Sequence, residues 1–219
     1  MLFLAFIFIL AILRLVNSHN RIVEAMILYL MRHGQTNWNL QGRTQGWKDT
    51  PLNDCGLNQA RMAAERLKSQ QIETIYSSDL KRCKKTADII SATLDLPIHY
   101  TQKLREMNFG KAEGVKKTDL AAKFPYIFQA FNDIKNVGRD EIAYPDGETI
   151  GEVQQRFIKF INRLRTDGRQ NVLIVTHGML IRLFSEAVFK KTIRLDNGSV
   201  LRLVFDEKSK KFRSPKILF

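Results

Sequence analysis

Apolar and polar positions alternate along the chain from Met26 onward in a way that predicts strands and helices taking turns. Residues 27–32 (ILYLMR) and 171–176 (NVLIVT) are largely apolar runs, and each is followed by a histidine and a glycine. Uninterrupted apolar runs of this length are typical of strands that are buried on both faces of a sheet. Further strands are predicted over 73–80, 199–205 and 213–219.

In the segments between these strands, apolar residues recur at the spacing of an amphipathic helix. Thr149 with Glu152 fits a capping box that opens one helix, and Ser78 or Asp79 is available to cap another. Strands that alternate with helices are the signature of an α/β protein. We therefore expect a three-layer α/β/α sandwich with a mostly parallel central sheet. The helices are predicted over 56–68, 80–94, 149–165 and 178–189.

One segment interrupts this alternation. Residues 115–135 are rich in aromatic side chains, are helix-like, and are broken at Pro125. A Tyr-Pro-Asp-Gly turn at 144–147 closes the segment. We interpret the stretch from about 107 to 147 as a small helical cap inserted into a single domain over 26–219.

The first 25 residues differ in composition from the rest. Residues 2–13 are all apolar, but a membrane span needs roughly 20 such residues. Neither a cationic start nor a small-residue cleavage site of a good signal peptide is present. Residues 1–25 can be a weak signal or membrane anchor, an amphiphilic extension on a surface, or a non-native extension before a start at Met26. We favour the last, with a cytoplasmic enzyme; membrane association through residues 1–16 is the alternative.

Composition limits the size of the core and the classes of partner, but it does not identify a function. The chain has 219 residues, 44% of them hydrophobic, enough for one sizeable core. The net charge of +13 falls only to +12 without residues 1–25, so the basic character belongs to the body. Such a charge attracts phosphorylated substrates, nucleic acid and anionic lipid alike. No nucleic-acid module accompanies it, so we expect no nucleic-acid binding; the oligomeric state stays open.

Two cysteines bear on compartment and metal content. Cys55 and Cys83 are too few and too far apart for a disulfide framework or a zinc site. We expect two free thiols in a reducing compartment, and no metal centre.

Candidate chemistry gathers at the ends of two predicted strands. His33 and His177 each stand directly before a glycine, and strand ends of an open α/β sheet are where ligands bind. A single histidine there is more often structural, but two in matched contexts favour a site. Arg32 precedes the first histidine, and Arg82 lies at the start of a predicted helix. Guanidinium groups suit phosphate oxygens.

Six motifs in order make the chain recognisable. They resemble those of the histidine phosphatase superfamily, which includes the cofactor-dependent phosphoglycerate mutases and many small phosphatases. The resemblance runs from about Met26 to about Leu183 and is far more specific than one RHG tripeptide. The motifs are LMRHGQTNWN, GWKDTPLNDCGLNQA, IYSSDLKRCKKTA, LREMNFGKAEG, PDGET and IVTHG.

The resemblance implies a role for each candidate residue. His33 would be the nucleophile and Glu106 the proton donor, with Glu113 as the nearest rival for the acid. The transferring phosphoryl group would be bound by Arg32, Arg82 and His177, with a further polar contact from Asn39. Because two arginines and an imidazolium can replace metal ions at a phosphoryl group, neither metal nor cofactor is expected. Pocket-lining roles are expected for Gln45, Gly46 and Gly178.

The choice within the family rests on the cap and on the LREMNFGKAEG motif, which looks more like that of the small broad-specificity phosphatases and the α-ribazole or fructose-bisphosphatase relatives than that of the mutases. The resembling mutases carry a longer insertion, whereas only about 40 residues separate Glu106 from Gly147 here. A short cap favours access of water and hydrolysis. We therefore expect a metal-independent phosphatase that hydrolyses small phosphomonoesters through a phosphohistidine at His33. The alternatives are a cofactor-dependent phosphoglycerate mutase and a non-catalytic protein that binds phosphorylated ligands or a membrane surface.

Overall fold

The fold is described by a computed structural model that covers residues 25–213 and 215–219. The interpretations of the leader therefore lie outside the described residues, apart from Ala25. Within the described ranges, none of the helices combines the length and apolar character needed to cross a bilayer.

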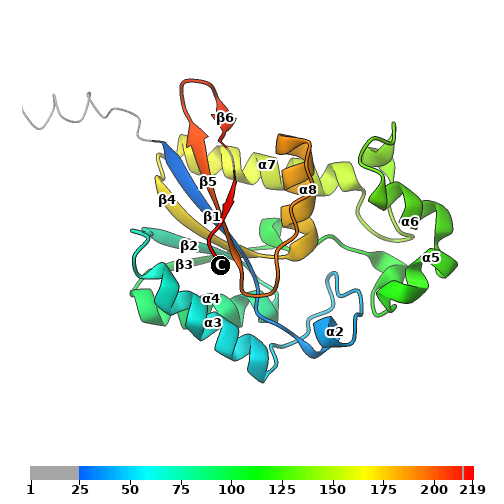
Figure 1. Ribbon diagram of the computed structural model, residues 1–219, viewed down its shortest axis with the longest axis horizontal. Helices are drawn as coiled ribbons and strands as arrows, with labels where there is room; N and C mark the ends of the chain where they lie inside the picture. Colours follow the sequence, from blue (N-terminus) through cyan, green and yellow to red (C-terminus); the bar gives the residue numbers. More distant parts are fainter. Residues whose placement is uncertain (1–24, 214) are drawn as a thin grey trace, which may run out of the picture.

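A seven-stranded mixed sheet forms the centre of the molecule (Figure 1). Its order is β3-β2-β4-β1-β5-β6, and β7 also pairs with β5. The strands β3, β2, β4 and β1 are parallel, and β5 runs antiparallel to β1. This confirms the mostly parallel core. The strands are β1 (Met26–Arg32), β2 (Thr74–Ser78), β3 (Ile98–Thr101), β4 (Asn171–Thr176), β5 (Val200–Asp206), β6 (Lys211–Phe212) and β7 (Lys216–Ile217).

Helices cover both faces of the sheet, as Figure 1 shows. Helices α3 (Asp54–Leu67) and α4 (Lys81–Leu94) pack on one face, where Ala64, Leu67 and Ile90 share a buried cluster with strand residues. Helices α7 (Ile150–Thr166) and α8 (Gly178–Phe189) pack on the other, where Phe157 and Phe184 are buried. The two apolar clusters confirm the three-layer α/β/α sandwich.

The cap lies beyond the carboxyl ends of the parallel strands (Figure 1). Its helices are α5 (Leu120–Lys123) and α6 (Pro125–Asn132), separated at the predicted Pro125 break. The rings of Phe109, Phe124 and Phe131 surround Tyr144 at centroid distances of 5.1 to 5.9 Å. Short 3-10 helices complete the region: η1 (Gln102–Leu104), η2 (Gly110–Ala112), η3 (Lys117–Asp119) and η4 (Arg139–Glu141).

Two local predictions about helix starts had different outcomes. The capping box at Thr149 and Glu152 is present and opens α7. The predicted cap of α4 by Ser78 or Asp79 is wrong, because the N-cap position is Leu80, which makes no side-chain cap bond. Instead Asp49, from a distant loop, accepts a hydrogen bond from Lys81 N at 2.6 Å, while Asp79 pairs with Arg105.

Three short elements also depart from the prediction. Strand β3 was not predicted, and the strand predicted over 213–219 is reduced to β7. The four-residue α2 (Asn37–Leu40) forms within a segment predicted as loop. None of these changes the layer order.

Candidate active site

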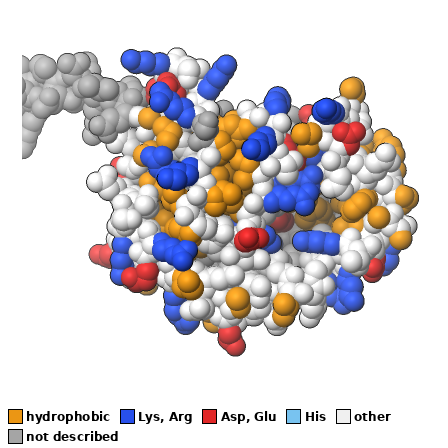
Figure 2. All heavy atoms as spheres, viewed as in Figure 1, with side chains coloured by type: hydrophobic (Ala, Val, Ile, Leu, Met, Phe, Trp, Pro, Cys, Tyr) orange, Lys and Arg blue, Asp and Glu red, His pale blue; other side chains and the backbone are white. Residues whose placement is uncertain are grey.

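The register of β1 and β4 brings the two predicted histidines together. Arg32 is paired with Thr176, so His33 and His177 follow at the same edge of the sheet. Their ring centroids are 5.2 Å apart with an edge-on arrangement, and both side chains are buried. A cavity of about 400 Å³, hereafter the pocket, opens here between the strand ends and the cap. Figure 2 shows basic side chains gathered around a hollow between the regions of α8 and α6.

His33 presents one ring nitrogen for chemistry. Its Nδ1 lies 2.7 Å from the Gly34 carbonyl oxygen, which can only accept, so Nδ1 carries the proton. Nε2 therefore keeps its lone pair. Burial, followed by the positive charges of Arg82 and Arg32, holds the pKa of His33 well below its usual value of 6.5. The imidazole is thus neutral at physiological pH.

Arg82 is fixed by three hydrogen bonds at the base of the pocket. Its guanidinium donates to Gly46 O at 2.7 Å, to Lys48 O at 2.9 Å and to His177 Nδ1 at 3.2 Å. Because His177 Nδ1 accepts, its Nε2 carries the proton and donates to Ser78 Oγ at 2.9 Å. His177 lies behind the pocket rather than in its lining, and burial followed by Arg82 lowers its pKa well below 6.5.

Arg32 completes the cationic wall next to His33. Its Nη1 donates to the Leu195 carbonyl at 2.7 Å. Its buried Nε has no partner among the described residues. Gly178, the first residue of α8, lines the pocket and allows close approach, since a Cβ there would lie 3.2 Å from Arg32 Nε.

Glu106 lines the pocket from the segment that leads into the cap. Its carboxylate accepts hydrogen bonds from the backbone N–H groups of Met107, Met179 and Leu180 at 3.0 to 3.1 Å. Two of these donors belong to the first turn of α8, which favours negative charge. The rival Glu113 is outside the lining and accepts instead from Trp47 N at 2.7 Å.

The other predicted pocket residues divide between lining and support. Asn39 lines the pocket, and its Oδ1 accepts from Thr36 and from Asn197 Nδ2. Gln45 also lines it, with Oε1 accepting from the hydroxyls of Thr36 and Thr50. Gly46 is not in the lining. Its contribution is the carbonyl that holds Arg82, and its φ of +54° suits glycine.

Two residues near Glu106 were missed by sequence reasoning as part of the site. Trp47 Nε1 donates to the Glu106 carbonyl oxygen at 2.8 Å, and Arg156 Nη2 donates to the same oxygen at 3.0 Å. Arg156 is itself held by Glu148. Both fix the main chain that carries the carboxylate. Glu148 in the PDGET motif could have pointed to Arg156, its ion-pair partner, but the sequence analysis assigned Glu148 no partner.

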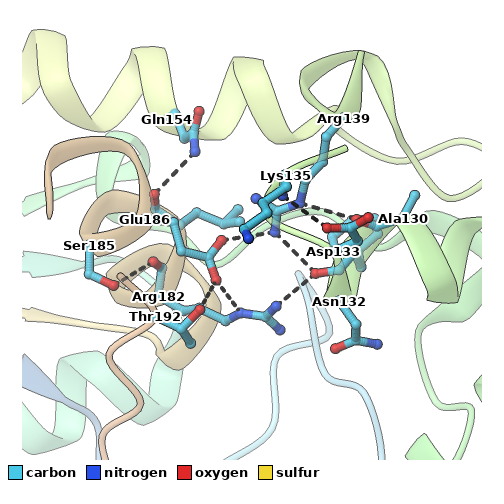
Figure 3. Close-up of polar contacts among 12 residues, drawn as sticks. Ala130, Asn132, Asp133, Lys135, Arg139, Gln154, Arg182, Ser185, Glu186 and Thr192 are labelled. Carbon is cyan, nitrogen blue, oxygen red and sulfur yellow. Dashed lines mark hydrogen bonds and ion pairs between the residues drawn. The ribbon is translucent and has the colours of Figure 1, made fainter. Parts of the chain in front are cut away.

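A buried ionic network attaches the cap to α8 (Figure 3). Glu186 of α8 pairs with Arg182 and with Arg139 of η4, each at 2.8 Å. Both arginines also donate to the Phe131 carbonyl at the end of α6. Although burial alone would raise the pKa of Glu186, its hydrogen bonds, led by the one from Arg182, lower it. The wall formed by Phe128 and Phe131 is therefore fixed relative to α8.

A metal is not indicated by the side chains. Among the described residues, no group of three or more His, Cys, Asp or Glu side chains is arranged to hold a metal ion. The charged groups facing the pocket are instead mostly guanidinium groups, which are ready-made partners for phosphate oxygens.

Comparison with known proteins agrees with this arrangement. A family model described as the histidine phosphatase superfamily (branch 1) matches residues 28–217. The chain belongs to the histidine phosphatase superfamily. Its fold class, and its relation to phosphatases and phosphoglycerate mutase-like enzymes, are thereby confirmed.

Three relatives of this histidine phosphatase illustrate the range of the family. Phosphatase PhoE of Bacillus subtilis, described as uncharacterized, is 37% identical over 153 residues, which cover 69% of this chain and 72% of that protein. Phosphoglycerate mutase-like protein 4 of Arabidopsis thaliana is 34% identical over 168 residues, covering 75% and 71%. A mycobacterial glucosyl-3-phosphoglycerate phosphatase solved with VO3 superimposes with a TM-score of 0.75 at 29% identity, covering 88% and 98%.

Proposed function

We propose that this histidine phosphatase hydrolyses small phosphomonoesters without a metal, through a phosphohistidine on His33. The observation that carries the proposal is the Nδ1–H bond of His33 to Gly34 O. It leaves Nε2 as a free nucleophile on a side chain that lines the pocket with Arg32 and Arg82. A neutral imidazole between two guanidinium groups suits attack on a dianionic phosphate.

The first half-reaction transfers the phosphoryl group to the protein. Nε2 of His33 attacks phosphorus while the bond from phosphorus to the leaving oxygen breaks. Arg32 and Arg82 stabilise the charge on the non-bridging oxygens, and the proton on Nε2 of His177 keeps Nδ1 available to orient Arg82. Glu106, in its protonated form, donates a proton to the leaving alkoxide. The alcohol departs.

The second half-reaction restores the enzyme. The Glu106 carboxylate accepts a proton from water as the water oxygen attacks phosphorus, and the phosphorus–nitrogen bond breaks. Inorganic phosphate leaves, and His33 is neutral again. The same carboxyl group thus serves as acid and then as base, and the backbone donors at the α8 N-terminus favour the carboxylate form that acts as base.

Hydrolysis and mutase activity differ only in what captures the phosphohistidine. The short cap supports hydrolysis, as do two relatives that are named phosphatases. Mutase activity is the second candidate, favoured by the relative named as mutase-like. A phospho-ligand binding protein without turnover would not need Glu106, which is held in place by three backbone donors.

The test uses the full chain with p-nitrophenyl phosphate, and with 3-phosphoglycerate plus its bisphosphate primer, all in EDTA. We expect phosphate release that survives EDTA and falls by at least about 10⁴-fold in His33→Ala. The exposed His99 of β3 provides the matched control, since His99→Ala should retain activity. Glu106→Gln should slow alkyl esters far more than p-nitrophenyl phosphate, whose leaving group needs no proton.

The outcomes separate the candidates. Activity that persists in His33→Ala would rule out the phosphohistidine. Isomerisation of 3-phosphoglycerate without phosphate release would move the assignment to mutase. Absence of both activities, with binding of phosphate intact, would favour the non-catalytic protein.

A further inference from the structure

The pocket holds more positive charge than one phosphoryl group needs. Six cationic side chains and a single carboxylate, Glu106, belong to its lining among the described residues. A phosphomonoester carries at most two negative charges, and the two arginines beside His33 match them. The cations are Arg32, Arg43, Arg82, Lys117, Arg182 and Arg194.

Two of the remaining four cations already have protein partners. Arg182 pairs with Glu186, which it shares with Arg139, and donates to Phe131 O. Arg43 donates to Gly114 O at 2.7 Å and to Gln41 Oε1 at 3.1 Å. Their positions are explained by the fold itself.

Lys117 and Arg194, hereafter the outer pair, are different. Neither side chain has a hydrogen-bond or ion-pair partner within the described part of the chain. Lys117 comes from η3 at the start of the cap, and Arg194 from the loop between α8 and β5. Both line the pocket.

Lys117 and Arg194 are both exposed, but the electrostatic environment of Lys117 disfavours its positive charge. Partial loss of hydration lowers the pKa of Lys117 most, followed by the positive charge of Arg32; Glu106 raises it by less, and Arg194 has the smallest lowering effect. The six cations of the pocket outnumber its one described carboxylate, and like charges repel each other. A bound anion would relieve this repulsion.

We propose that the natural substrate carries a second anionic group, a carboxylate or a second phosphate, on its leaving group, and that the outer pair binds it. The inference rests on the proposed function, since it assumes that the phosphoryl group occupies the side of His33. The pocket of about 400 Å³ lies in the range of about 300 to 1,000 Å³ that is usual for small-molecule sites, so it has room for such a molecule. Apolar contacts would come from Leu120 and Phe128.

The test compares three matched substrates. Glycerol 3-phosphate, 3-phosphoglycerate and glycerol 1,3-bisphosphate share a three-carbon leaving group that ends in a hydroxymethyl group, a carboxylate and a phosphate. We expect phosphate release with kcat/KM at least tenfold higher for one or both anionic members. The better of the two identifies the anion.

Variants then assign the preference to the outer pair. Lys117→Gln and Arg194→Gln should each lower kcat/KM for the preferred anionic substrate about tenfold, mainly through KM, and affect glycerol 3-phosphate much less. Lys116→Gln and Lys191→Gln remove neighbouring exposed charges outside the pocket lining and serve as matched controls. Arg194→Lys should restore most of the preference, because it keeps the charge.

The possible failures are distinguishable. Equal activity on all three substrates, or equal losses on all three in the outer-pair variants, would overturn this inference and leave the phosphatase intact. Absence of phosphate release from every substrate, p-nitrophenyl phosphate included, would overturn the proposed function and this inference with it.

Discussion

Two pairs among the six cations of the pocket are held in opposite ways. Around His33, the guanidinium groups of Arg32 and Arg82 are tied to backbone carbonyls of Leu195, Gly46 and Lys48. The outer pair has no such ties among the described residues. Fixed donors suit a reaction in which the positions of the oxygens decide the rate. Unfixed charges suit recognition, where a carboxylate or a phosphate needs charge more than geometry.

The largest difference between the two pairs is expected when an arginine is replaced by lysine, which keeps the positive charge but removes the planar guanidinium group. Arg82→Lys replaces a planar fork that has three partners, so we expect kcat/KM to fall by about 10²- to 10³-fold. Arg194→Lys should lower kcat/KM less than about threefold on an anionic substrate. Steady-state kinetics of both variants, with folding checked by circular dichroism, provide the measurement. Similar losses at the two positions would contradict the division.

A second test is to loosen the cap from the body. Glu186→Gln leaves Arg139 and Arg182 buried without their counter-charge, which typically costs about 3 kcal/mol or more. Urea unfolding at pH 7 would measure the loss. The exposed pair of Glu65 and Lys68 gives the control, since Glu65→Gln should cost under about 0.5 kcal/mol.

Kinetics of Glu186→Gln would also show which pair of cations depends on the cap, the outer pair or the two arginines beside His33. The cap contributes Lys117 to the outer pair but none of the residues that we propose to bind the phosphoryl group. Glu186→Gln should therefore raise KM for anionic substrates more than it lowers kcat on p-nitrophenyl phosphate. The reverse result would place the cap in control of the reaction itself.

The two groups also differ in how far the sequence predicted them. His33 and His177 could be predicted to meet because each follows an apolar strand, and adjacent parallel strands end at one edge. Arg82 was placed by its position at a helix start. The outer pair could not be predicted, because only the tertiary structure brings Lys117 and Arg194 to one pocket.

Other misses have the same physical cause. Asp49 caps α4 from 32 residues away, so no local capping pattern exists at Ser78 or Asp79. Strand β3 is short, and its exposed His99 and Tyr100 hide the alternation that would indicate a strand. Trp47 and Arg156 both donate to the Glu106 carbonyl, but one lies 59 residues before Glu106 and the other 50 residues after it. Elements with a long local pattern were predicted, whereas contacts with distant partners and the short elements β3 and α2 were not.

A smaller effect is expected in the pH dependence of folding stability, to which the buried imidazoles of His33 and His177 contribute. The folded pKa values of His33 and His177 lie well below 6.5, so the unfolded chain takes up protons near pH 6.5 and the folded chain does not. Stability from these groups is therefore present above pH 6.5 and is lost as the pH falls below it. Between pH 7 and pH 6 we expect a loss of about 1 to 1.5 kcal/mol.

Unfolding free energies in phosphate-free buffer at the two pH values would measure this loss. His33→Asn should reduce the pH dependence by about half, because it removes one of the two titrating groups. His99→Asn should leave it nearly unchanged. A flat stability would contradict the lowered pKa values, and a stability that rises on acidification would show that the folded protein favours charged imidazoles, which would remove the neutral nucleophile from the mechanism.

The smallest effect is expected where the cap rejoins the body. Thr149 accepts a hydrogen bond from Glu152 N at 3.1 Å, and Glu152 accepts one from Thr149 N at 2.8 Å. Thr149→Ala should cost about 1 kcal/mol in urea unfolding, with kcat/KM on p-nitrophenyl phosphate unchanged within about twofold. The adjoining Glu148 holds Arg156, and Arg156 holds the Glu106 carbonyl. A large loss of activity would therefore mean that the start of α7 transmits its position to the acid, and that the reacting group depends on the cap junction as well as on the sheet.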